Sequence, residues 1–252
     1  ATGIRGNWDD RREVIAKSPA MVGVLRQAAR AAQSDASVLL LGESGTGKEI
    51  VAQYIHQHSP YRKKQMVAIN CTSLPESLLE AELFGYEKGA FTGAASGGKI
   101  GLIEAAANNT LLLDEVNSMP LSLQAKLLRV LETKAVIPVG SVKPRAVNFR
   151  LICASNVALA QCVKEGTFRM NLYYRLNVIP ITIPPLRERR EDITPLADYF
   201  LDHFCQKYGL QKEFSSRVYQ ILNHYKWPGN IRELRNLVEH MVVMSESSVV
   251  KI

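Results

Sequence analysis

Residues 38–49 read VLLLGESGTGKE, an apolar run followed by a glycine-rich segment that ends in Lys48 and Glu49. The apolar residues 38–41 are typical of a buried strand, and the amphipathic residues 50–56 are typical of a helix. The spacing G-x-x-x-x-G-K between strand and helix is that of a phosphate-binding loop. Glycines let backbone N–H groups turn toward an anion, and the helix N-terminus adds positive partial charge. An ordinary glycine-rich turn is the alternative, but the position of Lys48 favours a phosphate site.

The phosphate-loop residues are all candidates for nucleotide binding. Lys48 supplies a positive charge for the terminal phosphates. Glu49 stands where Ser or Thr usually binds magnesium, so we expect phosphates, water and Asp114 to complete the magnesium shell. The candidate nucleotide-binding residues of this segment are Gly42, Glu43, Ser44, Gly45, Thr46, Gly47, Lys48 and Glu49.

The composition is that of an ordinary globular protein, with 252 residues, 46% of them hydrophobic and 22% charged. This length suffices for one large domain, or for one domain with a small one attached. We expect neither a membrane-spanning helix nor a signal peptide. The start Ala-Thr-Gly, without Met, suggests a tag remnant or an excised domain. The four cysteines lack metal-ligand spacing, and Cys71 and Cys153 follow apolar runs, so we expect buried thiols in a reducing, cytoplasmic setting.

The net charge of +7 and the pI of about 9.2 permit an anionic partner without establishing one. The basic residues are scattered over 62–64, 143–150 and 187–190, and acidic residues are interleaved with the last group. No helix-turn-helix or zinc motif accompanies this charge. We therefore interpret these basic residues as parts of solvent-exposed faces and as nucleotide ligands, and not as a DNA-binding surface.

Strand-like and helix-like segments alternate through most of the chain. Strands are expected at 38–41, 66–70, 110–114, 150–155 and 178–183, and helices within 14–33 after the turn at Ser18 and Pro19, and at 50–56, 74–83 and 121–132. The segment 84–94 contains too much glycine for one helix. This alternation predicts a parallel α/β sheet, and the nearly continuous apolar strands indicate that helices cover both faces.

After Glu191 and Asp192 the pattern becomes helical, at 193–208, 216–224 and 231–244, with no strand expected between these helices. Asn230 and Glu233 resemble a capping box, so a helix should begin near Ile231. The predicted division is a linker or tag remnant at 1–13, an α/β nucleotide-binding part at 14–190, a helical lid at 191–244 and a tail at 245–252 that leads toward an absent DNA-binding domain.

The apolar strand at 110–114 ends in the adjacent carboxylates Asp114 and Glu115. After a phosphate loop, such a pair is a Walker B arrangement. Asp114 can hold the magnesium shell, and Glu115 can polarise the attacking water. Two acids at a strand end are also common by chance, but their place after the phosphate loop favours hydrolysis.

Asn70 and Asn156 each follow a predicted strand and should lie at the carboxyl edge of the sheet, where ligands gather in open α/β folds. An amide there can bridge the γ-phosphate, the water and Glu115, although either residue alone is more often a turn residue. Arg169 and Arg175 lie six positions apart. An arginine from a neighbouring subunit can complete a slow hydrolytic site, but the spacing alone favours a surface pair.

The hexapeptide at 89–94 places Phe91 between two glycines. A large apolar side chain in a glycine-flanked loop is suited to contact a partner. A tight turn with Phe91 folded back onto the protein is an equally good interpretation of these residues alone.

Several stretches together resemble the central AAA+ domain of bacterial sigma-54-dependent transcription activators, over about 14–244. They are GESGTGKE at 42–49, ELFGYEKGAFTGA at 82–94, LLLDE at 111–115, LQAKLLRVLE at 123–132, PPLRERREDI at 184–193 and WPGNIRELRN at 227–236. The resemblance implies an AAA+ P-loop NTPase with a five-stranded parallel sheet between helices, followed by a small all-helical lid. Within this family Glu49 is the expected residue.

In such activators, hexameric rings bind ATP and Mg²⁺ between subunits, and hydrolysis remodels the sigma-54 RNA polymerase closed complex. By resemblance, Lys48 and Asp114 are the nucleotide and magnesium residues, Glu115 is the catalytic base, and Asn70 moves Glu115 into and out of position. Alternatives are an AAA+ ATPase that remodels a different protein or DNA partner, and a DNA-binding regulator that uses ATP to oligomerise.

The resemblance also assigns the remaining candidates. Asn156 corresponds to the first sensor, Arg232 to the second, and Arg169 and Arg175 to arginine fingers that act in trans. Further nucleotide-binding candidates are Val14, Ile15 and Ile193. The sigma-54 contact falls on Gly89, Ala90, Phe91, Thr92, Gly93 and Ala94. This loop should interrupt the helix after the second strand, with a second loop near 137–147 supporting it.

Two departures from the family pattern are visible. Ser155 replaces a usual Thr before Asn156, and Asn108 and Asn109 replace a usual Gly-Gly pair. Neither departure changes the expected ATPase activity. Full-length activators add a regulatory domain and a helix-turn-helix that contacts promoter DNA, and we expect neither within these residues.

Overall fold

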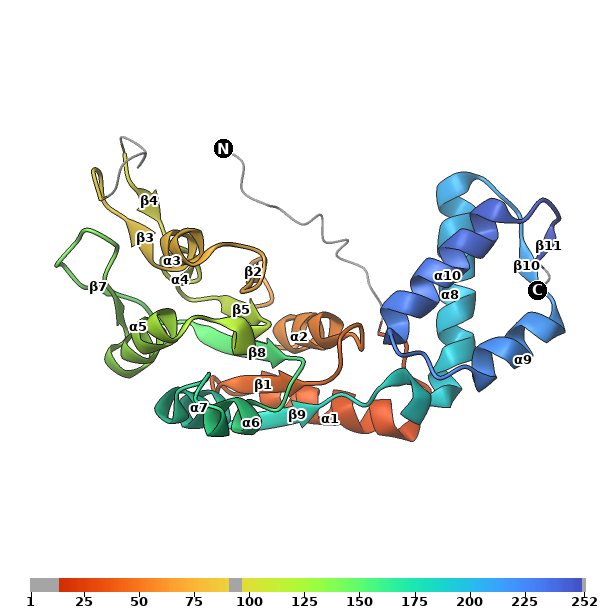
Figure 1. Cartoon of the computed structure of the whole chain (residues 1–252), viewed down its shortest axis with the longest axis horizontal. Coiled ribbons are helices and arrows are strands. Elements are labelled where there is room, and N and C mark those ends of the chain that lie inside the picture. Colours follow the sequence, from red (N-terminus) through yellow and green to blue (C-terminus); the bar gives the residue numbers. More distant parts are fainter. Residues whose placement is uncertain (1–13, 91–96, 251–252) are drawn as a thin grey trace.

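A five-stranded parallel sheet organises the first part of the computed structural model, which describes residues 14–90 and 97–250 (Figure 1). The strand order is β2-β5-β8-β1-β9, and each neighbouring pair is parallel. The bounds are β1 (Val38–Leu41), β2 (Val67–Asn70), β5 (Thr110–Asp114), β8 (Arg150–Ser155) and β9 (Ile179–Thr182). Asn70 pairs with Asp114, so the polar strand ends share one edge. The predicted strands and fold class are confirmed.

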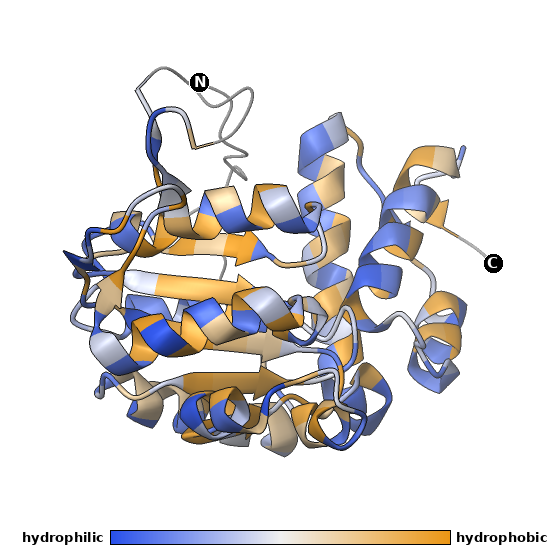
Figure 2. Cartoon of the chain, turned by 60° about the vertical axis from the view of Figure 1, so that its left-hand side comes forward, coloured by the Kyte–Doolittle hydropathy of each residue, from blue (hydrophilic) through white to orange (hydrophobic). Residues whose placement is uncertain are grey.

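Helices cover both faces of this sheet because side chains alternate along each strand. Val38, Leu40 and Leu112 share one buried cluster with α1 (Pro19–Ala32) and α2 (Lys48–Gln57). Leu39 and Leu111 belong to the cluster on the other face. The helices of that face are α3 (Glu76–Phe84), α4 (Leu102–Ala105), α5 (Leu121–Thr133), α6 (Leu159–Lys164) and α7 (Met170–Leu176). Figure 2 shows the apolar strands enclosed between these layers.

A second unit follows, which we call the helical unit, formed by α8 (Ile193–Tyr208), α9 (Ser216–His224) and α10 (Asn230–Met244). Its buried cluster is separate from those of the sheet and includes Phe204, Trp227 and Leu234. In Figure 1 it stands beside the sheet as a distinct body. No helix in the described residues combines the length and apolarity needed to cross a bilayer.

A short strand pair corrects the expectation that no strand lies between these helices. Strand β10 (Glu213–Phe214) pairs in parallel with β11 (Val249–Val250). Two residues are too few to show a strand period in sequence. Val250 is 2% exposed, so the segment after α10 packs back onto the helical unit.

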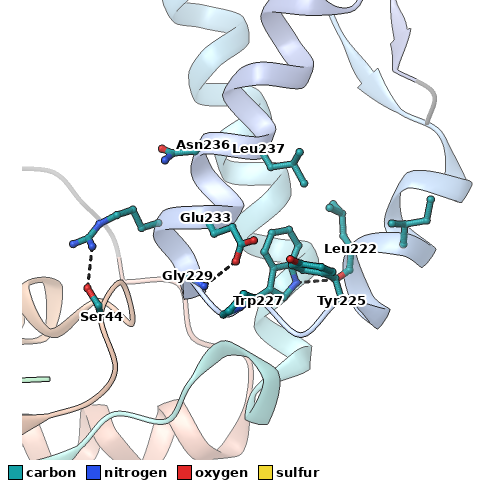
Figure 3. A pocket seen from close by; sticks show the side chains of 11 residues that line it. Ser44, Leu222, Tyr225, Trp227, Gly229, Glu233, Asn236 and Leu237 are labelled. Atoms are coloured by element: carbon teal, nitrogen blue, oxygen red, sulfur yellow. Dashed lines mark hydrogen bonds between the residues drawn. The ribbon is translucent and has the colours of Figure 1, made fainter. Parts of the chain in front are cut away.

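The start of α10 also differs from the prediction. Gly229 is the N-cap, and the carboxylate of Glu233 accepts a hydrogen bond from the Gly229 N–H at 2.8 Å (Figure 3). Asn230, predicted as the capping residue, is instead the first helical residue, with a φ of 54°. Its side chain is engaged elsewhere, as described below, and does not cap the helix.

Two hairpins project from the α3/α5 side of the sheet. Strands β3 (Gly85–Tyr86) and β4 (Lys99–Ile100) separate α3 from α4, as predicted for the first loop, while β6 (Ala135–Val136) and β7 (Arg145–Ala146) form the second. The Glu87 N–H donates to the Val139 carbonyl at 3.0 Å. Arg145 forms ion pairs with Glu87 at 2.6 Å and Glu104 at 2.9 Å. The two hairpins therefore contact each other at their bases.

The predicted partner-binding hexapeptide is only partly described. Gly89, with a φ of 77°, and Ala90 lie at the end of the first hairpin's described arm. Phe91, Thr92, Gly93 and Ala94 lie outside the described residues. The predicted burial of Cys71 and Cys153 is confirmed, and both are free thiols.

The carboxylate of Asp192 fixes the start of α1. It is fully buried and accepts hydrogen bonds from the N–H groups of Lys17 and Ser18 and from the Ser18 hydroxyl, at 2.6–2.8 Å. Replacing Asp192 by Ala leaves these donors without an acceptor, so we expect a loss of about 3 kcal/mol in the free energy of unfolding. Urea denaturation should measure it. The matched change Asp202→Ala, at an exposed position of α8, should cost little, and equal midpoints for the two variants would contradict this role.

Candidate nucleotide-binding site

The phosphate loop joins β1 to α2 in a conformation that needs its glycines. Gly45 and Gly47 have φ values of 78° and 96°, in the left-handed region. A Cβ at Gly45 would lie 2.4 Å from the Gly229 carbonyl oxygen, so the helical unit approaches the loop too closely for any side chain. The Lys48 amine is buried and donates to the carbonyls of Gly42 at 2.8 Å and Glu43 at 3.3 Å. A bound phosphate could replace these carbonyls as its partner.

Asp114 and Glu115 lie beside this lysine. Asp114 Oδ1 accepts the Glu115 N–H at 3.0 Å, and Glu115 Oε1 lies 3.9 Å from Lys48 Nζ. Burial raises the pKa of Glu115, while the charge of Lys48 acts in the opposite direction. Burial likewise lowers the pKa of Lys48. The other oxygen of Glu115, Oε2, is buried without a hydrogen-bond partner among the described residues. Such an oxygen suits a site that receives a water molecule.

The two predicted amides do lie at this edge of the sheet, but not with the contacts expected. Asn70 Nδ2 donates to Asp114 Oδ2 at 2.9 Å, and Asn70 Oδ1 accepts from Thr72. The expected contact between Asn70 and Glu115 is not among the hydrogen bonds of the described residues. Asn156 follows β8, and its backbone N–H stabilises the ionised form of Glu115.

Magnesium fits the donors that are present. Carboxylate oxygens such as those of Asp114 and Glu115 are hard ligands, which Mg²⁺ prefers. In residues 14–90 and 97–250, no three His, Cys, Asp or Glu side chains group closely enough to hold a metal by themselves. Because Mg²⁺ commonly binds through one or two carboxylates, waters and substrate phosphates, Asp114 could hold it only together with such ligands.

The helical unit meets the phosphate loop at the beginning of α10. Arg232 donates to the Ser44 hydroxyl at 3.0 Å. The Ile231 N–H donates to the Gly45 carbonyl at 2.9 Å. These contacts place Arg232, the predicted second sensor, beside the loop that would hold the phosphates.

A cavity of about 190 Å³ opens next to Thr46 and Gly47. Val14 and Ile15, which were predicted to bind the nucleotide, line it. Ile193 does not line it, because its side chain is fully buried in the core of the helical unit. Residues not predicted from the sequence complete the lining: Met21, Ile50, Arg189, Leu196, Tyr199, Phe200, His203, Ile231 and Arg235. Tyr199 and His203 are one turn apart on α8, a spacing that could have indicated a shared face.

Arg169 and Arg175 do not belong to this site. Arg169 Nε donates to the Leu121 carbonyl at 3.0 Å, and an Arg175 nitrogen donates to the Leu131 carbonyl at 3.1 Å. Both arginines thus contact α5. A role at a nucleotide would therefore be at the site of another copy of the chain.

Comparison with known families agrees with this geometry. Residues 14–182 match the Sigma-54 interaction domain family, and residues 187–252 match the AAA+ ATPase lid domain. This chain belongs to the sigma-54 interaction domain family. The predicted family is thereby confirmed, and the lid match extends through the segment that forms β11.

Several known regulators are similar over most of this chain. UacR of Escherichia coli (strain K12), provisionally named a uric acid sigma-54-dependent transcriptional regulator, is 52% identical over 231 residues, which are 91% of this chain and 39% of UacR. Regulatory protein AtoC of the same strain is 48% identical over 238 residues, 94% of this chain and 51% of AtoC. The chain thus spans only part of these relatives.

Solved structures of NtrX from Brucella abortus share the fold. The complex with ATP has a TM-score of 0.87 at 33% identity and covers 96% of this chain and 53% of that one. The complex with ADP has the same TM-score at 34% identity, covering 96% of this chain and 54% of that one. These neighbours bind adenine nucleotides on the same AAA+ architecture.

Proposed function

We propose that this chain binds ATP with Mg²⁺ and hydrolyses it. The observation that carries the proposal is the buried Glu115 carboxylate, 3.9 Å from Lys48 at the end of the phosphate loop, with one oxygen left without a partner among the described residues. Lys48 and the loop N–H groups would hold the phosphates, and Asp114 would hold Mg²⁺, which neutralises phosphate charge. Glu115 would orient and deprotonate the attacking water. The ATP and ADP complexes of NtrX support the choice of nucleotide.

The cavity beside Thr46 and Gly47 is the proposed adenine site. Its lining is largely apolar and aromatic, with Ile15, Tyr199 and Phe200 among its walls, as is usual for sites that bind flat heterocycles. Residues from both the sheet and the helical unit contribute. Nucleotide binding would therefore favour a fixed arrangement of the two units.

We further propose that the chain acts as a ring-forming motor on the sigma-54 RNA polymerase closed complex, in the cytoplasm. Membership of the sigma-54 interaction domain family supports the partner. The chain leads from Asn70, at the carboxylate edge, through α3 directly into the first hairpin. Conversion of ATP to ADP beside Asp114 could thus shift the first hairpin between two conformations. The shift can be no larger than the difference in the nucleotide's affinity for these two conformations. Asn70 and Asn156 would sense the γ-phosphate. Promoter DNA would be bound mainly by other parts of a longer protein.

The rival function is an AAA+ ATPase with a different partner, and Phe91 discriminates between the two. Replacing Phe91 by Ala should weaken sigma-54 binding about thirty-fold or more, because a buried aromatic anchor commonly contributes 2 kcal/mol or more. ATP turnover should stay within about two-fold, because Phe91 is not one of the residues proposed to bind or hydrolyse the nucleotide. Fluorescence anisotropy with labelled sigma-54 and a non-hydrolysable ATP analogue measures the binding.

Met244→Ala removes an exposed apolar side chain at the far end of α10, and should change neither sigma-54 binding nor ATP turnover. Sigma-54 binding that survives Phe91→Ala would show that the loop assignment is wrong. The same loss in the Met244 variant would show that the effect is not specific to the loop.

A further inference from the structure

The carboxylate of Glu43 is turned toward the segment that enters the helical unit. Both of its oxygens accept hydrogen bonds from the Arg187 guanidinium, at 2.6 and 2.8 Å. This pairing and a hydrogen bond from Asn230 lower the pKa of Glu43 to about 2. Glu43 is therefore ionised throughout the working range of pH. The second residue of the phosphate loop thus contributes its backbone to the loop and its side chain to a contact with Arg187.

Asn230 joins three segments through one side chain. Its amide nitrogen donates to Glu43 Oε2 at 3.2 Å and to the Ser44 carbonyl at 3.1 Å. Its amide oxygen accepts the Leu186 N–H at 2.8 Å. Asn230 is fully buried and has the left-handed φ of 54°. A non-glycine residue in this conformation is strained, and such strain persists where surrounding contacts determine it.

The residues next to these contacts are the ones that complete the nucleotide site. Arg189, two positions after Arg187, donates to the Thr46 carbonyl at 2.6 Å and lines the cavity. Arg232, two positions after Asn230, donates to Ser44. Figure 3 shows Ser44 facing the beginning of α10, where Gly229 and Glu233 lie. The placement of Arg189 and Arg232 therefore depends on the segments that Glu43 holds.

We propose that Glu43, Arg187 and Asn230 form a clasp that closes the helical unit on the phosphate loop and so positions Arg232 and the cavity wall. These three are positioning residues, since they act through Arg232 and the adenine cavity. The inference rests on the proposed ATPase and adds a coupling between the phosphate loop and the helical unit. Loosening the clasp opens the cavity, which weakens nucleotide binding, and displaces Arg232, which slows hydrolysis.

The side chains of Glu43 and Arg187 are 42% and 38% exposed, so both can be replaced without leaving a buried charge. We expect Glu43→Ala and Arg187→Ala each to raise KM for ATP and to lower kcat by about five-fold, the scale of a partly exposed ion pair. Because the two residues act as a unit, the double variant should lose no more than either single one. Arg187 lies outside the phosphate loop, so its effect cannot come from direct damage to the loop.

Glu239→Ala is the matched control, since it breaks a similar 2.9 Å ion pair with Lys207 on the surface of the helical unit. It should change neither KM nor kcat. The whole chain is measured at a protein concentration where the rate per subunit no longer rises. Additive losses in the double variant, or unchanged KM in both single variants, would overturn the clasp.

Hydrogen exchange provides a readout that does not depend on catalysis. The Leu186 N–H bonds to Asn230, and the Ile231 N–H bonds to Gly45. We expect both amides to exchange faster in Glu43→Ala, while amides of β5 stay protected; equal acceleration everywhere would indicate general destabilisation and would overturn the clasp. If the wild-type chain releases no phosphate, the proposed function fails, while unchanged exchange at these amides would refute the clasp itself.

Discussion

Replacing Glu115 by Gln should lower kcat for ATP hydrolysis by about 10²–10⁴-fold, the range expected when a general base is removed. Gln has nearly the same shape but accepts no proton at neutral pH. The proposed nucleotide ligands, Lys48 and the loop N–H groups, remain in place. The dissociation constant of a fluorescent ATP analogue should therefore change little while phosphate release almost stops. Glu132→Gln, at an exposed position of α5, is the control and should behave as the wild type.

The pH dependence of the rate adds a second readout for Glu115. Burial raises the pKa of this carboxyl, and only its ionised form can accept a proton. As pH falls through the raised pKa, kcat of the wild type should fall with it, at a pH above the usual range for Glu. The residual kcat of Glu115→Gln should not show this fall at low pH. Phosphate release that is unchanged in the variant would exclude hydrolysis through Glu115.

The sheet was predictable because its determinants are local. Each of the five strands is a short apolar run, and β1 and β5 end in the glycine loop and the carboxylate pair. Parallel strands with helices on both faces then bring Asn70, Asp114 and Asn156 to one edge. The β10–β11 pair was missed, since two-residue strands separated by most of the helical unit leave no periodic signal.

Residue patterns alone did not predict the other half of the site, because it depends on how two units far apart in sequence meet. Only the family resemblance indicated Arg232, Val14 and Ile15 there. Arg187 and Arg189 belong to a mixed charged run that we interpreted as partly solvated, yet Arg189 is 1% exposed and bonded to Thr46. The residues around Asn230 indicated a helix cap. Its contact with Glu43 spans 187 positions, and no local pattern indicates such a contact. Ile193 was assigned to the nucleotide, whereas the orientation of α8 turns Leu196 to the cavity instead.

A second large effect is expected at Arg175, which contacts α5 of its own chain and not its own phosphate loop. If it completes the site of a neighbouring copy, Arg175→Ala should reduce kcat by about 10³–10⁵-fold, the range seen for arginine fingers. Lys48→Ala should also be inactive, because it removes the charge that holds the phosphates. The two variants fail for different reasons. Arg175→Ala keeps an intact nucleotide site, and Lys48→Ala keeps the arginine.

Mixing the two inactive variants tests whether the arginine acts in trans. In a head-to-tail ring assembled at random from equal amounts, about a quarter of the interfaces would join an intact site to an intact arginine. ATPase activity should therefore reappear on mixing and rise with total protein concentration. The matched control mixes Arg175→Ala with the double variant Lys48→Ala/Arg175→Ala, which supplies the same surface without the arginine and should restore nothing. Mixtures that remain inactive, although sedimentation shows that they assemble, would assign Arg175 to the surface pair that its spacing alone suggested.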